Sequence, residues 1–282
     1  MIKKVIVTGC NGQLGRAVNE LYAGDTSYRF VNTDVAELDI TNIDAVMALV
    51  REVKPYAIIN CAAHTNVDAC ETQMDLAYKI NAIGPRNLSI AATETGAKLM
   101  HISTDYVFDG KGTRPYLEFD KPDPQGAYGM TKLAGENMVR DFADRYFILR
   151  TAWLYGDGKN FVKTMLRISE TNDTVSVVKD QVGSPTSTKE LAAAIKHLLF
   201  TENYGLFHAT CEGSCSWAQF AEEIFRLAGK KTVVRPITSE EFAAKAPRPA
   251  YSILENYMWK LTTDYMFADW HDAIAEYLKD VK

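Results

Sequence analysis

The sequence predicts an α/β protein built on a doubly wound parallel sheet, followed by a smaller and mostly helical C-terminal lobe. Strand and helix signals alternate through residues 1–150, and helical patterns dominate after residue 150. Alternation of this kind produces a parallel sheet with helices on both faces. We therefore expect one domain over 1–150 and a second lobe over 151–282, with segments of the lobe interleaved with the first domain.

Each expected strand of the first domain is a short apolar or β-branched run, as in strands buried on both faces. The strands are expected at residues 5–8, 30–34, 57–61, 98–102 and 147–150. The helices between them are expected at residues 12–22, 43–53, 76–95 and 128–145. Thr41 or Asn42 would cap the second helix, and Gly96 would end the third.

The C-terminal lobe shows helical periodicity with a few short strand signals. Its helices are expected at residues 161–170, 189–200, 216–227, 240–246 and 270–279. Its strands are expected at residues 174–178, 206–209 and 233–234. Because no flexible linker separates the two parts, we expect a ligand between them, above the carboxyl ends of the strands.

Composition indicates an ordinary globular protein and excludes several classes. The 282 residues are 47% hydrophobic and 24% charged, with a net charge of -5, which argues against a nucleic-acid partner bound by a broad basic face. The chain shows neither an apolar run of membrane-spanning length nor a signal-peptide pattern. We therefore predict a cytoplasmic protein without membrane partners.

The cysteines and histidines predict no metal site. The five cysteines are scattered, as expected of reduced thiols. His208, Cys211 and Cys215 come nearest to a ligand set, but their spacing matches no common zinc pattern.

Three glycines, Gly9, Gly12 and Gly15, follow the first strand and open the first helix. Gly9 can turn the chain sharply, Gly12 lets backbone N–H groups approach a pyrophosphate, and Gly15 lets helix and sheet pack closely. Gln13 and Leu14 lie between them and would share in cofactor binding. The context indicates a Rossmann-type dinucleotide site in the first domain, which makes the second lobe predominantly substrate-binding.

The ends of the next strands supply further candidates for the cofactor. Asp34, about 20 residues beyond the glycines, is placed to accept hydrogen bonds from the adenosine ribose. Its charge favours NADH over NADPH, although Arg16 could offset this. Asp39 and Ile40 could meet the adenine or form a simple turn. The small residues after the third strand would let the cofactor pass, and the candidates there are Ala62, Ala63 and Thr65.

Tyr128 and Lys132 are the candidate reacting pair. They lie four residues apart on an expected helix and so share one face. An ammonium nearby would lower the pKa of the phenol. Thr104 ends the fourth strand, where its hydroxyl could polarise a substrate carbonyl. The predicted catalytic group is therefore Thr104, Tyr128 and Lys132, with the last two also contacting the cofactor.

These motifs resemble the extended short-chain dehydrogenase/reductase superfamily, and within it the dTDP-4-dehydrorhamnose reductase family. The resemblance covers essentially the whole chain, most specifically in the stretches 60–68, 103–110, 150–156, 180–186 and 248–254. It implies NAD(P)H-dependent reduction of the 4-keto group of dTDP-4-dehydro-L-rhamnose, in dTDP-rhamnose and polysaccharide biosynthesis, with Tyr128 as general acid.

The resemblance also implies substrate contacts and bears on assembly. Asp105 and Trp153 would contact the sugar beside Thr104, while Arg248 and Ser252 would lie near the nucleotide. Some family members form metal-linked dimers through acidic residues, one of them just after the third glycine. Arg16-Ala17-Val18-Asn19 lacks that acid, although Glu190 stands at one plausible ligand position. We therefore expect a monomer or a weak homodimer without metal.

Two alternatives remain at the level of sequence. Related dehydratases carry Thr-Asp-Glu at the fourth strand end, whereas here Thr104 and Asp105 precede Tyr106. That argues against dehydration, but an epimerase or a related nucleotide-sugar reductase stays open. A non-catalytic regulatory subunit, like the β subunit of methionine adenosyltransferase, resembles the same reductases.

Overall fold

A six-stranded parallel sheet forms the centre of the computed structural model, which describes residues 2–281. Its strand order is β10-β5-β4-β3-β1-β2, and every neighbouring pair is parallel. The strands are β1 (Lys3–Thr8), β2 (Tyr28–Thr33), β3 (Ala57–Asn60), β4 (Lys98–Thr104), β5 (Tyr146–Thr151) and β10 (Gly205–His208). The chain runs outward from β1 to β2, then returns to the other side of β1 with β3. The predicted doubly wound sheet is thus confirmed, and its switch point lies between β1 and β3.

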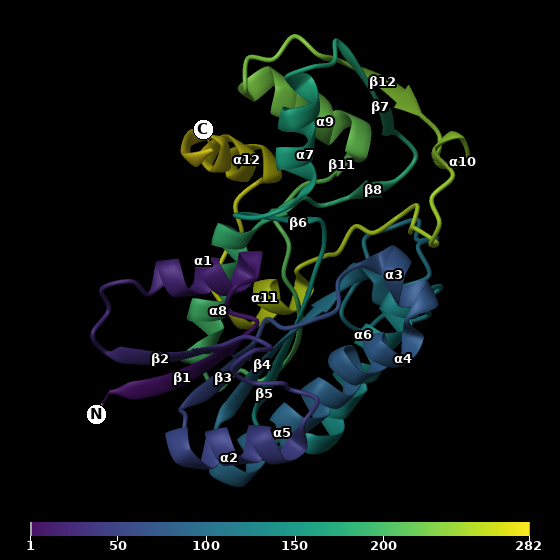
Figure 1. Cartoon of the computed structure of the whole chain (residues 1–282). Coiled ribbons are helices and arrows are strands. Elements are labelled where there is room, and N and C mark those ends of the chain that lie inside the picture. Colours follow the sequence, from purple (N-terminus) through teal and green to yellow (C-terminus); the bar gives the residue numbers. More distant parts are fainter. Residues whose placement is uncertain (1, 282) are drawn as a thin grey trace.

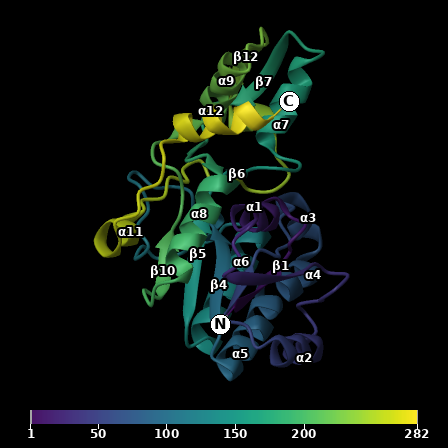
Figure 2. The same cartoon turned by 90° about the vertical axis from the view of Figure 1, so that its left-hand side faces the viewer.

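Helices cover both faces of this sheet because alternate strand residues point to opposite sides (Figure 1). Val5 and Val7 join a core with α1 (Gln13–Leu21), α8 (Thr188–Leu199) and α11 (Tyr257–Thr262). Ile6, between them, joins the opposite core with three other helices. These are α2 (Ile43–Val53), α5 (Gly84–Thr95) and α6 (Ala127–Phe142). Figure 2 shows α1 and α8 together on the first face.

The helix expected over residues 76–95 is a longer and interrupted run. It comprises α4 (Met74–Tyr78), a π-helical turn at Lys79–Ile83 and α5, and α3 (Val67–Thr72) precedes it. Asn81 lies in the π turn, where its side chain accepts from His64 N at 2.8 Å and donates to Thr131 Oγ1 at 3.1 Å. A π turn widens the helix by one residue, which apolar periodicity does not reveal.

The C-terminal lobe packs three helices around its own apolar core, at the top of Figure 1. They are α7 (Phe161–Ser169), α9 (Trp217–Leu227) and α12 (Trp270–Asp280), beside the parallel pair β7 (Thr174–Val178) and β12 (Val233–Ile237). The helix expected at 240–246 was too long. Its counterpart, α10 (Ser239–Phe242), ends at Ala243, whose φ of 49° is incompatible with a continuing helix.

Four two-residue strands of the lobe were not expected from the sequence. They are β6 (Leu154–Tyr155), β8 (Val182–Gly183), β9 (Thr186–Ser187) and β11 (Cys215–Ser216). Pairs of residues show no periodicity, and these strands exist because β6 pairs with β9 and β8 with β11. Within residues 2–281, no helix is both long and apolar enough to cross a bilayer.

A buried ion pair joins α6 to the sheet. Arg150 of β5 donates from Nε and Nη2 to the two carboxylate oxygens of Glu136 at 2.8 and 2.7 Å. Ser103 Oγ of β4 donates to the same carboxylate at 2.6 Å. The Arg150 and Glu136 side chains are 1% and 0% exposed. This contact sets how α6, which carries Tyr128 and Lys132, sits against β4.

Replacing Arg150 by methionine should therefore destabilise the protein severely. The change removes the two short hydrogen bonds from Arg150 to the buried Glu136 carboxylate and leaves it the longer ion pair with Arg140 at 3.3 Å, and breaking such a pair costs about 3–5 kcal/mol. The free energy of unfolding, measured by urea denaturation, gives the cost. Arg51→Met is the matched control, because Arg51 pairs with Glu94 in the same two-pronged way on the surface. A stability loss no larger for Arg150→Met than for Arg51→Met would contradict this account.

Candidate functional site

The turn between β1 and α1 forms a cradle with no space for side chains. Gly9 has φ of 64°, and a Cβ placed on it would lie 2.7 Å from Ala62 N. A Cβ on Gly15 would overlap Gly9 O and lie 2.7 Å from Cys10 Cα. Gly12 precedes the first turn of α1 and supplies no side-chain cap, so the positive end of the helix stays available to an anion. The cradle fits the pyrophosphate of a dinucleotide.

A cavity of about 260 Å³ adjoins this cradle at the switch point of the sheet. Seven of the predicted cofactor residues line it: Gly9, Gly12, Asp34, Asp39, Ile40, Ala62 and Ala63. Asp34 lies at its rim and accepts hydrogen bonds from Asn11 N at 3.1 Å and Val35 N at 2.8 Å. The carboxylate is thereby held where a ribose hydroxyl would meet it.

Three other predicted cofactor residues lie elsewhere. Thr65 is exposed and does not line the cavity. Leu14 is 5% exposed and packs into the core, so only its main chain could face a cofactor. Gln13 turns to the other side of the cradle, where its Nε2 donates to Leu154 O at 3.2 Å.

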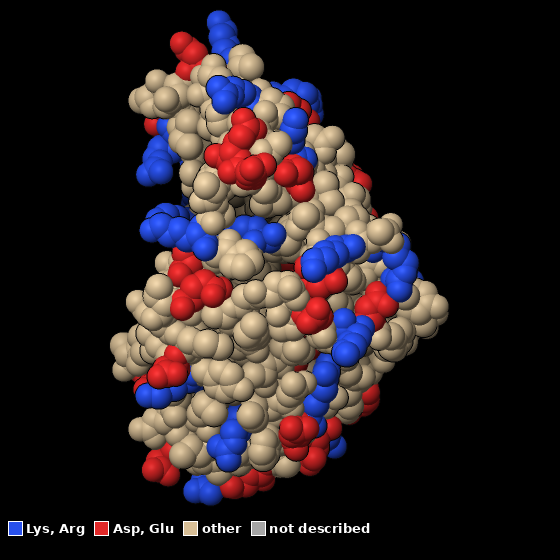
Figure 3. Space-filling model, turned by 90° about the vertical axis from the view of Figure 1, so that its right-hand side faces the viewer, with Lys and Arg blue, Asp and Glu red and all other residues tan. Residues whose placement is uncertain are grey.

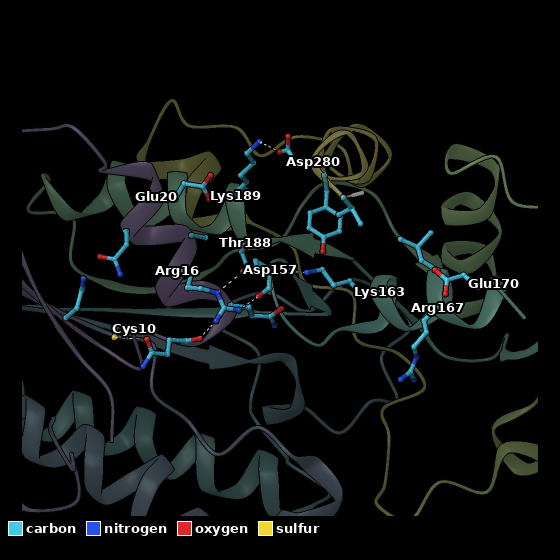
Figure 4. Close-up of a pocket in the computed structure, with 18 residues that line it drawn as sticks. Cys10, Arg16, Glu20, Asp157, Lys163, Arg167, Glu170, Thr188, Lys189 and Asp280 are labelled. Atoms are coloured by element: carbon cyan, nitrogen blue, oxygen red, sulfur yellow. Dashed lines mark hydrogen bonds and ion pairs between the residues drawn. The ribbon is translucent and has the colours of Figure 1, made fainter. Parts of the chain in front are cut away.

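A second cavity, of about 1150 Å³, lies between α1, α8, α7 and α12 (Figure 4). Its walls carry cations and anions in similar numbers, and several are paired. Arg16 Nε lies 3.0 Å from Asp157 Oδ2, and Lys189 Nζ lies 3.1 Å from Asp280 Oδ2. Arg16 therefore joins α1 to the turn before α7, and it does not line the cavity that holds Asp34.

Tyr128 and Lys132 lie in the first two turns of α6, beside the carboxyl end of β4. The Tyr128 ring meets Tyr106 edge-on at 5.4 Å between centroids. Burial raises the pKa of Tyr128, and a hydrogen bond with the Thr104 side chain opposes the rise. The phenol thus stays protonated at neutral pH, which is the form that donates a proton.

Lys132 is buried and held by main chain. Its Nζ donates to Ile102 O at 2.5 Å. Burial lowers the pKa of Lys132 to about 8, and the negative charge of Glu136 opposes that shift. We expected Lys132 to lower the pKa of Tyr128. Lys132 is not among the main groups that set this pKa, and burial has the largest effect on it.

Asp105 follows Thr104 into a short 3-10 turn, Asp105–Val107, and is 3% exposed. Its Oδ1 accepts from Thr104 Oγ1 at 3.0 Å, while Oδ2 has no partner within residues 2–281. Burial raises the pKa of Asp105 to about 6, and the nearby hydroxyls of Thr104 and Ser252 oppose the rise. The structure thus brings Thr104, Asp105, Tyr128 and Ser252 to one place.

Trp153 sits at the base of the C-terminal lobe in a strained conformation. Its φ of 48° is in the left-handed region, which costs a residue of this type about 1–3 kcal/mol. A Cβ on Gly183 would lie 2.6 Å from its indole and 2.7 Å from Ser252 Oγ. Gly183 therefore lets Trp153 and Ser252 approach the same point.

Arg248 lies apart from this group. Its Nη2 donates to Asp68 Oδ1 of α3 at 2.8 Å, and its Nη1 lies 3.4 Å from the Tyr106 hydroxyl. It lines a cavity of about 150 Å³ with Tyr106, Phe108 and Gly126. Figure 3 shows the molecule hollowed between the lobe and the sheet body, with lysine and arginine side chains along the hollow.

From the sequence we did not identify the buried residues whose hydrogen bonds fix the backbone and helix at the site. Asn60, at the end of β3, accepts from Thr8 Oγ1 at 2.7 Å and from Ala62 N at 3.2 Å, and its Nδ2 contacts His101 Nδ1 at 3.1 Å. This network fixes the turn that carries Ala62 and Ala63. Glu136, one helical turn after Lys132, was also missed, although that spacing could have singled it out.

The residues weighed as metal ligands have other partners. His208 Nδ1 contacts the carbonyls of Tyr116 and Glu255 at 3.1 Å, and burial lowers its pKa to about 3. Cys211 and Cys215 are buried in the lobe core. Glu190 accepts from Ala268 N at 3.0 Å.

The chain resembles known reductases over its whole length. Residues 3–282 match the RmlD substrate binding domain family. A dTDP-4-dehydrorhamnose reductase of Streptomyces griseus is 42% identical over 280 residues, covering 96% of this chain and 91% of that one. The crystal structure of a dTDP-4-dehydrorhamnose reductase from Clostridium acetobutylicum has a TM-score of 0.96 at 54% identity, covering 98% of both chains. The same enzyme from Bacillus anthracis, solved in complex with NADP, has a TM-score of 0.97 at 45% identity and 100% coverage of both.

The buried carboxyl of Asp105 should make stability depend on pH in an unusual direction. An unfolded aspartic acid titrates near pH 4, so the folded protein, with a pKa of about 6, binds more protons between these values. The free energy of unfolding contributed by Asp105 therefore falls as pH rises from about 4 to about 6, by about 3 kcal/mol.

Asp105→Asn removes this dependence. The stability difference between variant and wild type, measured by urea denaturation across pH 3.5–7.5, should grow in favour of the variant as pH rises. Asp109→Asn is the control. The partly buried Asp109 carboxyl accepts from the Tyr116 hydroxyl, which lowers its pKa, so its contribution to stability changes with pH in the opposite direction. A constant difference for Asp105→Asn would refute the buried, raised carboxyl.

Proposed function

Because the chain belongs to the RmlD substrate binding domain family, we propose that it reduces the 4-keto group of dTDP-4-dehydro-L-rhamnose with NAD(P)H, giving dTDP-L-rhamnose. The observation that carries the proposal is the grouping of Thr104, Tyr128 and Lys132 at the carboxyl end of β4, beside a glycine cradle that fits a dinucleotide. In this proposal a nicotinamide cofactor, when bound, supplies the hydride.

The protein's own part is to polarise the ketone and deliver a proton. The Thr104 hydroxyl orients the keto oxygen toward Tyr128. Tyr128, kept neutral by burial, donates its proton to that oxygen as negative charge develops. Lys132, whose Nζ is held by Ile102 O, is available to the ribose of the nicotinamide.

The sugar and nucleotide would be held by residues from both parts of the chain. Asp105 offers an unpaired carboxyl oxygen to the sugar, and Trp153 and Ser252 border the same space from the lobe. Arg248 supplies a cation for the nucleotide, with Asp68 fixing its direction.

For cofactor choice we propose a preference for NADH. Asp34 would repel a 2′-phosphate, and Arg16, the cation expected to offset it, is engaged by Asp157 at the second cavity. The Bacillus anthracis relative was solved with NADP. We therefore propose that this protein binds both cofactors and binds NADH more tightly.

We assign residues 1–150 to cofactor binding and 151–282 predominantly to substrate, with β10 and α8 completing the first unit. A monomer or weak homodimer in the cytoplasm remains our proposal for assembly and location.

Tyr128→Phe should lower kcat about 10²–10⁴-fold while leaving the affinity for NADH nearly unchanged, because only the proton donor is lost. Turnover is followed at 340 nm with dTDP-4-dehydro-L-rhamnose, and NADH affinity by fluorescence titration. Tyr22→Phe is the control, since its buried hydroxyl has no partner within the described residues. Wild-type protein that oxidises neither NADH nor NADPH would contradict the proposed reductase activity and favour a regulatory subunit. A Tyr128→Phe variant with normal activity would show that another group donates the proton.

Asp34→Ser should shift cofactor choice toward NADPH. Removing the carboxylate relieves its repulsion of the 2′-phosphate, so the ratio of kcat/KM for NADPH to that for NADH should rise about tenfold, the equivalent of about 1.4 kcal/mol. Asp39→Ser, at the same cavity, tests whether any lost carboxylate has this effect. An unchanged ratio in Asp34→Ser would remove Asp34 from cofactor choice.

A further inference from the structure

The indole of Trp153 lies flat against a second indole, that of Trp217. Their ring centroids are 3.5 Å apart and their planes differ by 6°. Phe161, the first residue of α7, packs on Trp217 at 4.6 Å. Both tryptophans are half-buried, so the pair packs against the lobe core while keeping part of its surface exposed.

Short strands bring these residues together from three distant segments. Trp153 immediately precedes β6, and Trp217 immediately follows β11. Because β11 pairs with β8, Cys215 lies opposite Gly183, the residue that abuts the Trp153 indole. Trp217 starts α9 behind a capping box formed by Ser216 and Gln219, which fixes the backbone where the helix begins.

The strained backbone of Trp153 needs a compensating contact. A φ of 48° is unfavourable for a tryptophan, so the conformation persists only where surrounding contacts over-determine it. The hydrogen bond from Thr186 N to Trp153 O, at 3.3 Å, is long. The stack on Trp217 brings the two ring faces into close parallel contact, with centroids 3.5 Å apart, and so blocks the indole of Trp153 from turning toward α9.

We propose that Trp217 is a positioning residue for substrate binding, which holds Trp153 in its left-handed conformation so that the indole forms a wall for the deoxysugar ring. The inference rests on the proposed function, in which Trp153 borders the sugar. The apolar C–H groups and the methyl group of a 6-deoxyhexose match an aromatic wall, while Asp105 and Ser252 receive the polar side. Trp217 acts through Trp153 and lies in a different lobe from the cofactor cradle.

Kinetics with both substrates tests the positioning role. Trp217→Leu should raise the KM for dTDP-4-dehydro-L-rhamnose about tenfold and leave the KM for NADH within about twofold of wild type. Trp217→Phe, which keeps a flat ring, should recover most of the loss and serves as the test if the leucine variant does not fold. Trp270→Phe is the control, because Trp270 is an indole of the same lobe that packs edge-on against Phe220 in the core.

A crystal structure of Trp217→Leu tests the conformational step without any substrate. The φ of Trp153 should return to a negative value, and its indole should leave Gly183. A Trp153 that keeps φ near its present value, or a Trp217→Leu enzyme with unchanged KM for the sugar nucleotide, would overturn the proposal. Equal increases in both KM values would likewise overturn it, as they indicate a general structural defect. If wild type itself shows no turnover, the proposed function fails while the structure of the variant still decides the role of Trp217.

Discussion

The buried contact of Glu136 with Arg150 and Ser103 determines where the reacting groups meet. Tyr128, Lys132 and Glu136 lie at four-residue intervals along one face of α6, and Ser103 precedes Thr104 in β4. Clamping Glu136 to β4 and β5 therefore sets the height of Tyr128 against Thr104. Such a pair is costly to bury, and its value here lies in fixing one register of helix on sheet. The same carboxylate opposes the lowering of the Lys132 pKa by burial. Glu136 therefore both anchors α6 to the sheet and affects the charge of Lys132.

The two halves of the site are built by different means. The cofactor cradle relies on the absence of side chains: Gly9, Gly12 and Gly15 let α1 and the turn after β3 approach the same point. The proposed substrate half contains two side chains under constraint, Trp153 in a left-handed conformation and Asp105 buried with a raised pKa. Both constraints destabilise the free protein, as expected where a site is organised before its ligand arrives. The arrangement suits a cofactor recognised by main chain and a sugar recognised by aromatic and polar groups.

Local patterns predicted the regular parts well. The five strands of the first domain were confirmed, as were the helices between them apart from the interruption at the π turn, because apolar runs and caps such as Asn42 and Gly96 are local signals. Seven of the predicted cofactor residues line one cavity, since strand ends of a parallel sheet converge at its switch point. The side chain of Gln13 turns to Leu154, because the direction of a side chain at a helix start depends on the lobe that packs there. The effect of Lys132 on Tyr128 was overestimated because four-residue spacing does not say where the Nζ atom points.

From its residues alone, the chain specifies a doubly wound sheet, a glycine cradle for a dinucleotide and a tyrosine–lysine pair on one helical face. These features depend on residue spacing and on which residues tolerate tight turns. Both properties can be read from residues that are neighbours in the sequence. The π turn at Asn81, the two-residue strands, the link from Arg248 to Asp68 and the stack of Trp153 on Trp217 depend on the folded chain. Each joins segments tens of residues apart or more, or changes a helix by a single residue, so no local pattern carries it. The sequence therefore predicts the candidate reacting groups. The shape of the proposed substrate site is decided only by the tertiary contacts between the lobe and the sheet.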